Sequence, residues 1–143
     1  MKPRQKKIVV LLCFLFMGLS IYSQSFTEQT GISLTGVRQA AVAWGDYDND
    51  KDLDILITGF NASSQRISKV YRNNGNNTFS PMDGIVLQGI APGSVCWGDY
   101  DNDGNLDILM AGSGNTMVYQ NNGDNTFSRD WGITLPGISN GTV

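Results

Sequence analysis

Two acidic stretches, WGDYDNDKDLDILITG at residues 44–59 and WGDYDNDGNLDILMAG at residues 97–112, repeat one pattern within this 143-residue chain. Together they contain nine of its 13 acidic residues. Carboxylates packed this closely repel one another unless a cation lies between them. The residues concerned are Asp46, Asp48, Asp50, Asp52 and Asp54 in the first stretch, and Asp99, Asp101, Asp103 and Asp107 in the second. We therefore expect two cation-binding loops of the same design.

The acidic stretches belong to a longer internal repeat, and a missed repeat leads to the wrong fold. An offset of 53 residues relates Trp44 to Trp97. Beyond residues 60–68 the offset becomes 48, which relates VYRNNGNNTFS at residues 70–80 to VYQNNGDNTFS at residues 118–128. The difference of five residues predicts a loop with an insertion at residues 60–68.

Each repeat carries the signals of short strands. Apolar and polar residues alternate before and after each acidic loop, as is typical of strands. Third strands are expected at residues 69–73 and 117–121, and the Asn-Gly pairs that follow favour hairpins leading to short fourth strands around Phe79 and Phe127. No helical periodicity follows residue 23. We therefore predict an all-β fold of β-propeller-type blades, each of four antiparallel strands.

The phase of the repeat predicts how these blades divide the chain. Residues 24–43 are expected to form an outer strand and the lead-in, residues 44–96 the first blade, and residues 97–143 the second blade and the start of the next. Alignment of the units places a third acidic stretch just beyond Val143. Because about four to eight blades close a propeller, two complete blades plus partial ones form an incomplete propeller. We expect the chain to be the N-terminal fragment of a longer protein.

The first 23 residues have the pattern of a bacterial-type signal peptide. A basic head precedes the apolar run IVVLLCFLFMGLS at residues 8–20, and Ser23 stands at a suitable cleavage point. A membrane anchor is the alternative, but the run is shorter than the roughly 20 residues that a span needs. The protein is therefore expected to be secreted, extracellular or at the cell surface, with no membrane association after cleavage.

Charge and cysteine content narrow the choice of partners. Without residues 1–23 the chain keeps six basic and 13 acidic residues, a formal net charge of −7. Such a chain lacks the basic patch that nucleic acid requires, so we exclude nucleic acid as a partner. Only Cys96 then remains, which rules out an intrachain disulfide. Its setting, SVCW, predicts a small buried side chain on a strand.

The spacing of the aspartates suits a hard divalent cation. Side chains at positions 1, 3, 5 and 9 of each loop converge on one point, and calcium accepts six to eight such oxygens in flexible geometry. The chain has no histidine, which disfavours zinc and copper. An EF-hand is rejected, because Ile57 and Met110 stand where it needs glutamate. The remaining alternative is a pair of solvated acidic turns, and the repeated spacing favours calcium.

The two loops differ at position 6, where the first has Lys51 and the second has Gly104. A turn with positive φ is harder for lysine than for glycine, and the lysine charge stands close to the cation. We expect the first loop to bind calcium more weakly, although Asp52 adds an offsetting negative charge.

The stretch WGDYDNDGNLDILM at residues 97–110, followed by VYQNNGDNTF at residues 118–127, resembles the FG-GAP/VCBS repeat. This repeat is the blade unit of integrin-alpha-like β-propellers in many secreted bacterial proteins, and the resemblance extends from Phe26 to the C-terminus. It implies one calcium ion in the loop between the first two strands of each blade, or about two ions in all. The implied ligands are the side chains of Asp46, Asp48, Asp50 and Asp54 with the carbonyl of Asp52, and the side chains of Asp99, Asp101, Asp103 and Asp107 with the carbonyl of Asn105.

The expected function is binding rather than catalysis. No histidine can activate a serine or threonine, and the carboxylates are committed to calcium, so we predict that the chain is not an enzyme. We expect a secreted module, held by structural calcium, that binds an extracellular protein or glycan in adhesion. The alternative is an accessory propeller of a larger secreted hydrolase or lyase whose catalytic domain lies outside this chain.

The three tryptophans are expected to differ. Trp44 and Trp97 occupy equivalent repeat positions and are predicted to pack in the blade cores. Trp131 aligns with Asp83 and breaks the repeat, which makes it the best of the three candidates for an exposed contact.

Overall fold

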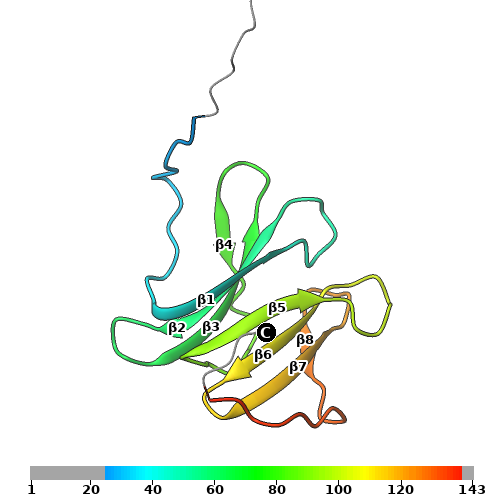
Figure 1. The fold of residues 1–143 in the computed structure, drawn as a ribbon. Helices are drawn as coiled ribbons and strands as arrows, with labels where there is room; N and C mark the ends of the chain where they lie inside the picture. Colours follow the sequence, from blue (N-terminus) through cyan, green and yellow to red (C-terminus); the bar gives the residue numbers. More distant parts are fainter. Residues whose placement is uncertain (1–24, 140–143) are drawn as a thin grey trace, which may run out of the picture.

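The computed structural model describes residues 25–139, which form two four-stranded antiparallel sheets (Figure 1). In both sheets the strands are neighbours in the same order as in the chain. The first sheet consists of β1 (Arg38–Gly45), β2 (Asp54–Phe60), β3 (Arg66–Asn73) and β4 (Phe79–Pro81). The second consists of β5 (Gly93–Gly98), β6 (Asp107–Gly112), β7 (Asn115–Asn121) and β8 (Phe127–Arg129).

The all-β prediction is confirmed: the described residues contain no helix, and the two sheets are propeller-like blades that do not close into a ring. No helix in this part of the chain is long and apolar enough to cross a membrane. The predicted signal peptide at residues 1–23 lies outside the described residues. Residues 25–37 belong to no strand, so the outer strand expected within residues 24–43 stays a prediction.

Both sheets place their acidic loop at the same register. Gly45 pairs with Asp54 at the end of the β1–β2 hairpin, and Gly98 pairs with Asp107 at the end of the β5–β6 hairpin. In each sheet, the acidic loop therefore joins the first two strands at the same end of the sheet. The sheets extend over residues 38–81 and 93–129, so each first strand begins before its Trp.

The predicted insertion lies at the opposite end of the first sheet. The β2–β3 turn spans residues 61–65, and Asn61 closes it by donating its backbone N–H to the carbonyl of Gln65 (2.9 Å). The β6–β7 turn has only Ser113 and Gly114, which both have positive φ (56° and 79°), as a two-residue hairpin requires. The other two of the five extra residues lengthen β2 and β3 by one residue each relative to β6 and β7.

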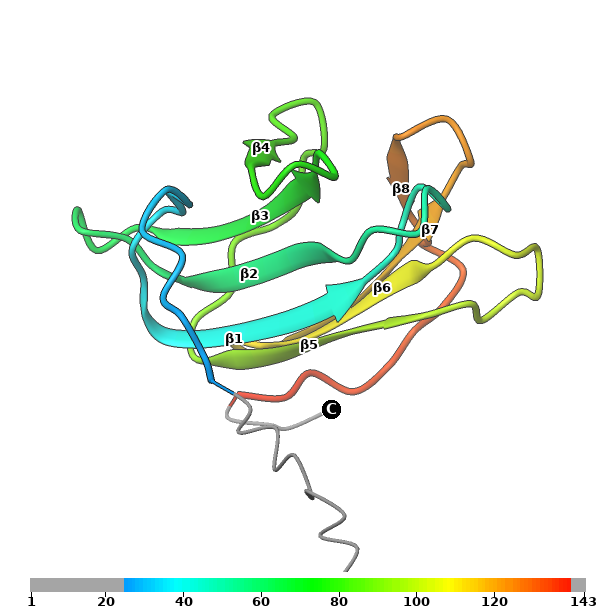
Figure 2. The same cartoon turned by 90° about the horizontal axis from the view of Figure 1, so that it is seen from above.

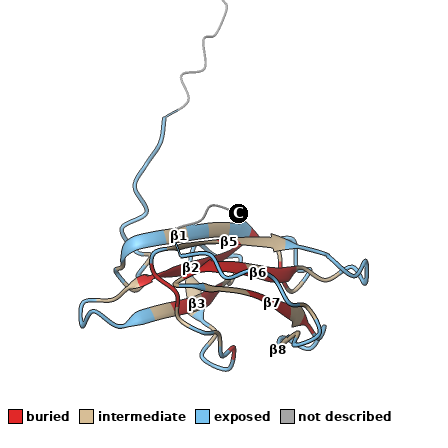
Figure 3. Cartoon of the chain, turned by 60° about the horizontal axis from the view of Figure 1, so that its bottom comes forward, coloured by how far each residue is buried: buried red, intermediate tan, exposed pale blue. Residues whose placement is uncertain are grey.

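The main core lies between the two sheets. β5 contacts β1 and β2, and the sheets diverge toward β4 and β8 (Figure 2). Apolar side chains of the inner strands fill this wedge, and the connection from β4 to β5 adds Ile85 and Ile90. Figure 3 shows the consequence: β2 and β6 are buried, whereas β1 is largely exposed. The most buried members, each at most 1% exposed, are Tyr47, Leu56, Val70, Ile90, Ile108 and Met110.

Two equivalent tryptophans have different environments. Trp97 stacks on Tyr47, with ring centroids 6.0 Å apart and planes 10° apart, and packs against the core. Trp44 faces away from the second sheet and is 57% exposed, with an edge contact to Phe79 at 6.1 Å. The core prediction is confirmed for Trp97 and wrong for Trp44, because no sheet among the described residues packs on the Trp44 side.

Cys96 lies on β5 between Val95 and Trp97, which both point into the core. Alternation along the strand turns Cys96 to the opposite face, where it is only partly buried. The predicted strand position is therefore confirmed, whereas the predicted burial is only partial. Burial still raises the pKa of its thiol, which disfavours the reactive thiolate.

We expect the side chain of Asn121 to be a main polar link between the sheets. It is 2% exposed and donates to the carbonyls of Tyr47 (2.8 Å) and Leu106 (3.2 Å). Replacement of Asn121 by Ala leaves a buried carbonyl without its donor, so we expect a loss of about 1–3 kcal/mol in the free energy of unfolding. Urea unfolding of dilute protein measures this loss.

The equivalent residue Asn73 provides the matched control. Its side chain donates to the carbonyl of Leu53 (3.2 Å) within its own sheet, and the structure gives it no bond to the other sheet. Asn73→Ala should therefore cost less than Asn121→Ala, and equal losses would contradict the role of Asn121 as a link.

Candidate metal sites in the acidic loops

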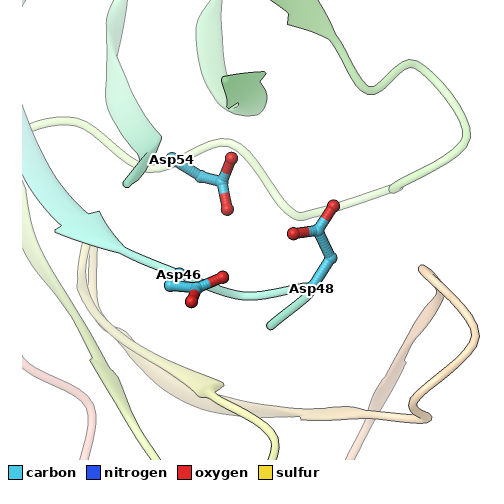
Figure 4. A group of neighbouring side chains, drawn as sticks. All are labelled: Asp46, Asp48 and Asp54. Carbon is cyan, nitrogen blue, oxygen red and sulfur yellow. The ribbon is translucent and has the colours of Figure 1, made fainter. Parts of the chain in front are cut away.

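Each acidic loop brings three carboxylates together. Acidic loop 1 (residues 46–54) joins β1 to β2, and acidic loop 2 (residues 99–107) joins β5 to β6. In each loop, one oxygen from each of three aspartates lies within 4.8 Å of the others. Figure 4 shows the carboxylates of the first group turned toward a common space. The groups are Asp46, Asp48 and Asp54, and Asp99, Asp101 and Asp107.

The last aspartate of each group is buried and held by backbone donors. Asp54 is 0% exposed and accepts N–H bonds from Tyr47 (3.1 Å) and Asn73 (2.8 Å). Asp107 is 2% exposed and accepts the equivalent N–H bonds from Tyr100 (3.1 Å) and Asn121 (2.8 Å). Each bond pair ties the acidic loop to the end of the third strand. These strand-end asparagines were not among the residues predicted from the sequence, although their recurrence before Asn-Gly was a usable signal.

The first aspartate of each group shapes the turn. The carboxylate of Asp46 accepts the backbone N–H groups of Asp50 and Lys51, both at 3.0 Å. Asp99 accepts those of Asp103 and Gly104, both at 3.1 Å. The loop thus wraps around its first carboxylate, and the acidic side chains converge on one side of the turn.

The remaining predicted site residues lie outside the two groups. Asp50 accepts the backbone N–H of Asp52 (2.9 Å), and Asp103 accepts that of Asn105 (2.8 Å). These are local turn bonds of the kind that acidic turns form without a metal. Ligation by Asp50 and Asp103, and by the carbonyls of Asp52 and Asn105, stays a prediction.

Electrostatics disfavour the ionised carboxylates when no cation is bound. Burial raises the pKa of Asp54 to about 6, against the effect of its two N–H donors, and the charges of Asp48 and Asp50 raise it further. Burial likewise raises the pKa values of Asp48 and Asp107. A cation between these groups would favour their charged forms and release the strain of their mutual repulsion.

The atoms of the first group fit a hard cation. The donors are all carboxylate oxygens, and Asp48 Oδ1 is buried without a hydrogen-bond partner. Such an oxygen is costly unless something binds it. In the second group the equivalent Asp101 accepts a bond from the side chain of Gln120 (2.6 Å). The first repeat has Arg72 at that position, and its positive charge offsets only part of the rise in the pKa of Asp48 that burial causes.

Comparison with family models finds one family at two places. A model of the FG-GAP-like repeat matches residues 58–110 and 99–143, which together make up more than half of the chain. The chain belongs to the FG-GAP-like repeat family. This membership confirms the resemblance seen in the sequence. Comparisons with curated proteins and with solved structures each gave no match.

The two acidic loops of this FG-GAP-like protein follow the same backbone path despite their difference at position 6. Lys51 has a φ of 77° and Gly104 a φ of 89°. Asn49 and Asn102 also agree, at 61° and 60°. Left-handed backbone costs a residue with a side chain roughly 1–2 kcal/mol. The expected strain at Lys51 is therefore present, and the weaker calcium binding of the first loop stays a prediction.

An exchange at position 6 tests this strain. Lys51→Gly relieves the left-handed conformation, and after allowance for the greater freedom of glycine in the unfolded chain we expect a gain of about 0.5–1 kcal/mol. Gly104→Lys should cost a similar amount, although a side chain there meets nothing within 4 Å. Thermal unfolding in chelator measures both effects, and equal shifts in the same direction would contradict the explanation.

Proposed function

We propose that this FG-GAP-like protein is a secreted calcium-binding β-propeller module that binds an extracellular protein or glycan in adhesion. The observation that carries the proposal is the pair of equivalent carboxylate groups, each with one buried aspartate. Because the groups recur at the same register in both sheets, the metal-binding feature belongs to the repeat and not to a single site. We therefore propose about two calcium ions, one per acidic loop.

A structural role suits these ions better than a catalytic one. Each carboxylate group comes from one loop and lies at the end of a strand hairpin, where charge neutralisation lets the loop fold tightly. A catalytic ion needs an open position beside a nucleophile or a general base. Extracellular calcium modules bind at roughly 10⁻⁴ to 10⁻³ M. That range suits a protein that meets calcium only after export, as the pattern of residues 1–23 indicates.

The exposed aromatic residue Trp131 supports a binding role. It is 77% exposed, as the sequence suggested, and the guanidinium carbon of Arg129 lies 4.0 Å from its ring centroid. The two residues line a shallow pocket together with Thr116 and Asp130. A flat ring beside charged and hydroxyl groups can stack on a sugar or pack against a protein side chain. We therefore place the proposed partner contact here.

We also propose that this chain is not itself an enzyme. It has no histidine, and its clustered carboxylates lie in the acidic loops. The alternative role, as accessory propeller of a secreted hydrolase or lyase, depends on sequence outside this chain, and no contact among residues 25–139 favours it.

Calcium should raise the melting temperature, and a chelator should lower it. At a calcium concentration of 10 to 100 times the dissociation constant, we expect each site to add about 1.4–2.7 kcal/mol to the free energy of unfolding. This corresponds to a shift of several degrees for a domain of this size. Calorimetric thermal unfolding in calcium and in chelator measures the shift.

Single substitutions separate the two sites. Asp54→Asn and Asp107→Asn should each remove one calcium equivalent in a titration, while Asp83→Asn, an exposed carboxylate outside both loops, should remove none. If the wild-type melting curve is the same in calcium and in chelator, the proposed calcium role is wrong.

A further inference from the structure

Three side chains form a row across the first sheet, at the end remote from acidic loop 1. Arg38 on β1 and Arg66 on β3 both pair with Phe60 on β2, which lies between them. Directly paired residues of neighbouring strands point to the same face of a sheet. The guanidinium carbons of Arg38 and Arg66 lie 4.8 and 5.8 Å from the centroid of the Phe60 ring. Two cationic groups therefore gather at one aromatic ring, and we call these three residues the arginine row.

The backbone beside the row is irregular. The register of β1 shifts between Arg38 and Ala41, and Gln39 in this bulge has a φ of 50°, which is uncommon for a residue with a side chain. A Cβ atom at Gly59 would lie 2.8 Å from Cβ of Val37 and 3.0 Å from the carbonyl oxygen of Arg38. Bulges re-aim side chains and are frequent next to active sites. This bulge brings Arg38 across to the Phe60 ring.

The second repeat shows that closing the hairpin does not require the row. The offset of 53 residues relates Arg38 to Ala91. It likewise relates Phe60 to Ser113, whose hydroxyl accepts the backbone N–H of Ala91 and donates to its carbonyl (both 3.1 Å). Phe60 and Arg66 are the residues by which β2 and β3 exceed β6 and β7. The second sheet thus closes the same rim with small side chains, and the row is a feature of the first repeat alone.

The positive charges of the row are not neutralised by neighbouring carboxylates. Neither arginine forms a salt bridge among residues 25–139. Arg38 donates to the hydroxyl of Ser64 (2.9 Å), but a guanidinium has five N–H donors. Residues 29–45 and 55–82, which supply nearly all of the first sheet, contain no acidic residue. An anionic ligand would therefore meet exposed donors and no like charge within this part of the sheet.

A shallow hollow of about 280 Å³ opens beside the row. Ligand pockets usually begin at about 300 Å³, so this hollow suits one small group rather than a large compound. Its wall combines the Phe60 ring with the charged group of Arg38. The lining residues are Gly36, Val37, Arg38, Phe60, Asn61 and Ala62.

We propose that the arginine row binds the anionic group, a carboxylate or a sulfate, of one residue of an extracellular saccharide. Guanidinium groups bind such anions with paired, charge-assisted hydrogen bonds, and the sugar ring lies in the hollow beside Phe60. A protein partner normally buries about 800 Å² of each surface, so a hollow of this size favours a single sugar residue. The anion site rests on the arginine row, whereas the choice of an extracellular ligand rests on the proposed function.

An NMR titration of the isotope-labelled full chain in calcium tests the site. Glucuronate and a sulfate ester of glucose should shift the backbone resonances of residues 36–39 and 59–66, and the two ligands separate the carboxylate source from the sulfate source. Glucose, which has the same ring without the charge, should bind roughly tenfold more weakly or not at all, because it forms no charge-assisted bond. Acetate and inorganic sulfate, which lack the ring, should also bind more weakly than the matching sugars.

Substitutions at the row should weaken glucuronate binding while the fold stays intact. Arg38→Gln and Arg66→Gln should each weaken binding by roughly tenfold or more, because each removes a charged donor. Arg66→Lys keeps the charge but loses the planar fork, so it should recover only part of the binding. Lys69→Gln is the matched control on β3, because alternation turns Lys69 to the opposite face, where it pairs with Asp83. This control should leave binding unchanged, and thermal unfolding of each variant shows whether it is folded.

Three results would overturn the proposal. They are equal binding of glucose and glucuronate, glucuronate binding that survives both arginine-to-glutamine substitutions, and tighter binding of the peptide-like carboxylate N-acetylglutamic acid amide than of glucuronate. The effect of calcium on the melting temperature is measured separately. A calcium shift without glucuronate binding would contradict only the saccharide site, and glucuronate binding without a calcium shift would contradict only the calcium role.

Discussion

One buried carboxylate in each repeat connects three parts of the fold. Asp54 begins β2, accepts an N–H from the acidic loop at Tyr47, and accepts another from the end of β3 at Asn73. These bonds fix the backbone of Tyr47, whose ring then supports Trp97 from the other sheet. This carboxylate therefore helps to position both the acidic loop and the stacking surface between the sheets. The same carboxylate also adds to the negative charge in the loop, which a bound cation would neutralise.

The aspartate thus couples charge to packing. Its burial favours the neutral acid, whereas a cation held by the neighbouring aspartates favours the carboxylate. The backbone bonds to Asp54 are stronger when it is ionised. A bound cation would therefore strengthen the bonds that position the aromatic core. This coupling gives a physical reason for the first acidic loop to lie beside the interface between the two sheets.

Sequence patterns among near neighbours in the chain predicted most of the fold, whereas features that depend on contacts between distant residues were not predicted. Alternation, the Asn-Gly turns and the repeat offset predicted the strands and their order, because these features depend on neighbours in the chain. The spacing of the aspartates also predicted that the side chains of each loop converge, and Asp46, Asp48 and Asp54 do form a group, while the part of Asp50 in it stays a prediction.

Features that depend on contacts between the sheets could not be predicted from the sequence. Trp44 and Trp97 have the same repeat position, and only the packing of a neighbouring sheet separates the buried residue from the exposed one. The backbone donors of Asn73 and Asn121 were missed because every residue except proline has an N–H, so only the recurrence of asparagine before Asn-Gly in both repeats marked these positions.

The β2–β3 and β6–β7 hairpins lie at the ends of the sheets remote from the acidic loops, and they differ in length. This difference indicates where the sequence of the repeat can diverge. The β2–β3 turn contains five residues and the β6–β7 turn two, yet both acidic loops keep one backbone path. Length changes at this rim leave the bonds of Asp54 and Asp107 intact, because none of those bonds involves the turn. The rim at residues 61–65 is therefore the part of the repeat in which evolution, or a protein engineer grafting a foreign peptide, can change sequence and length most freely.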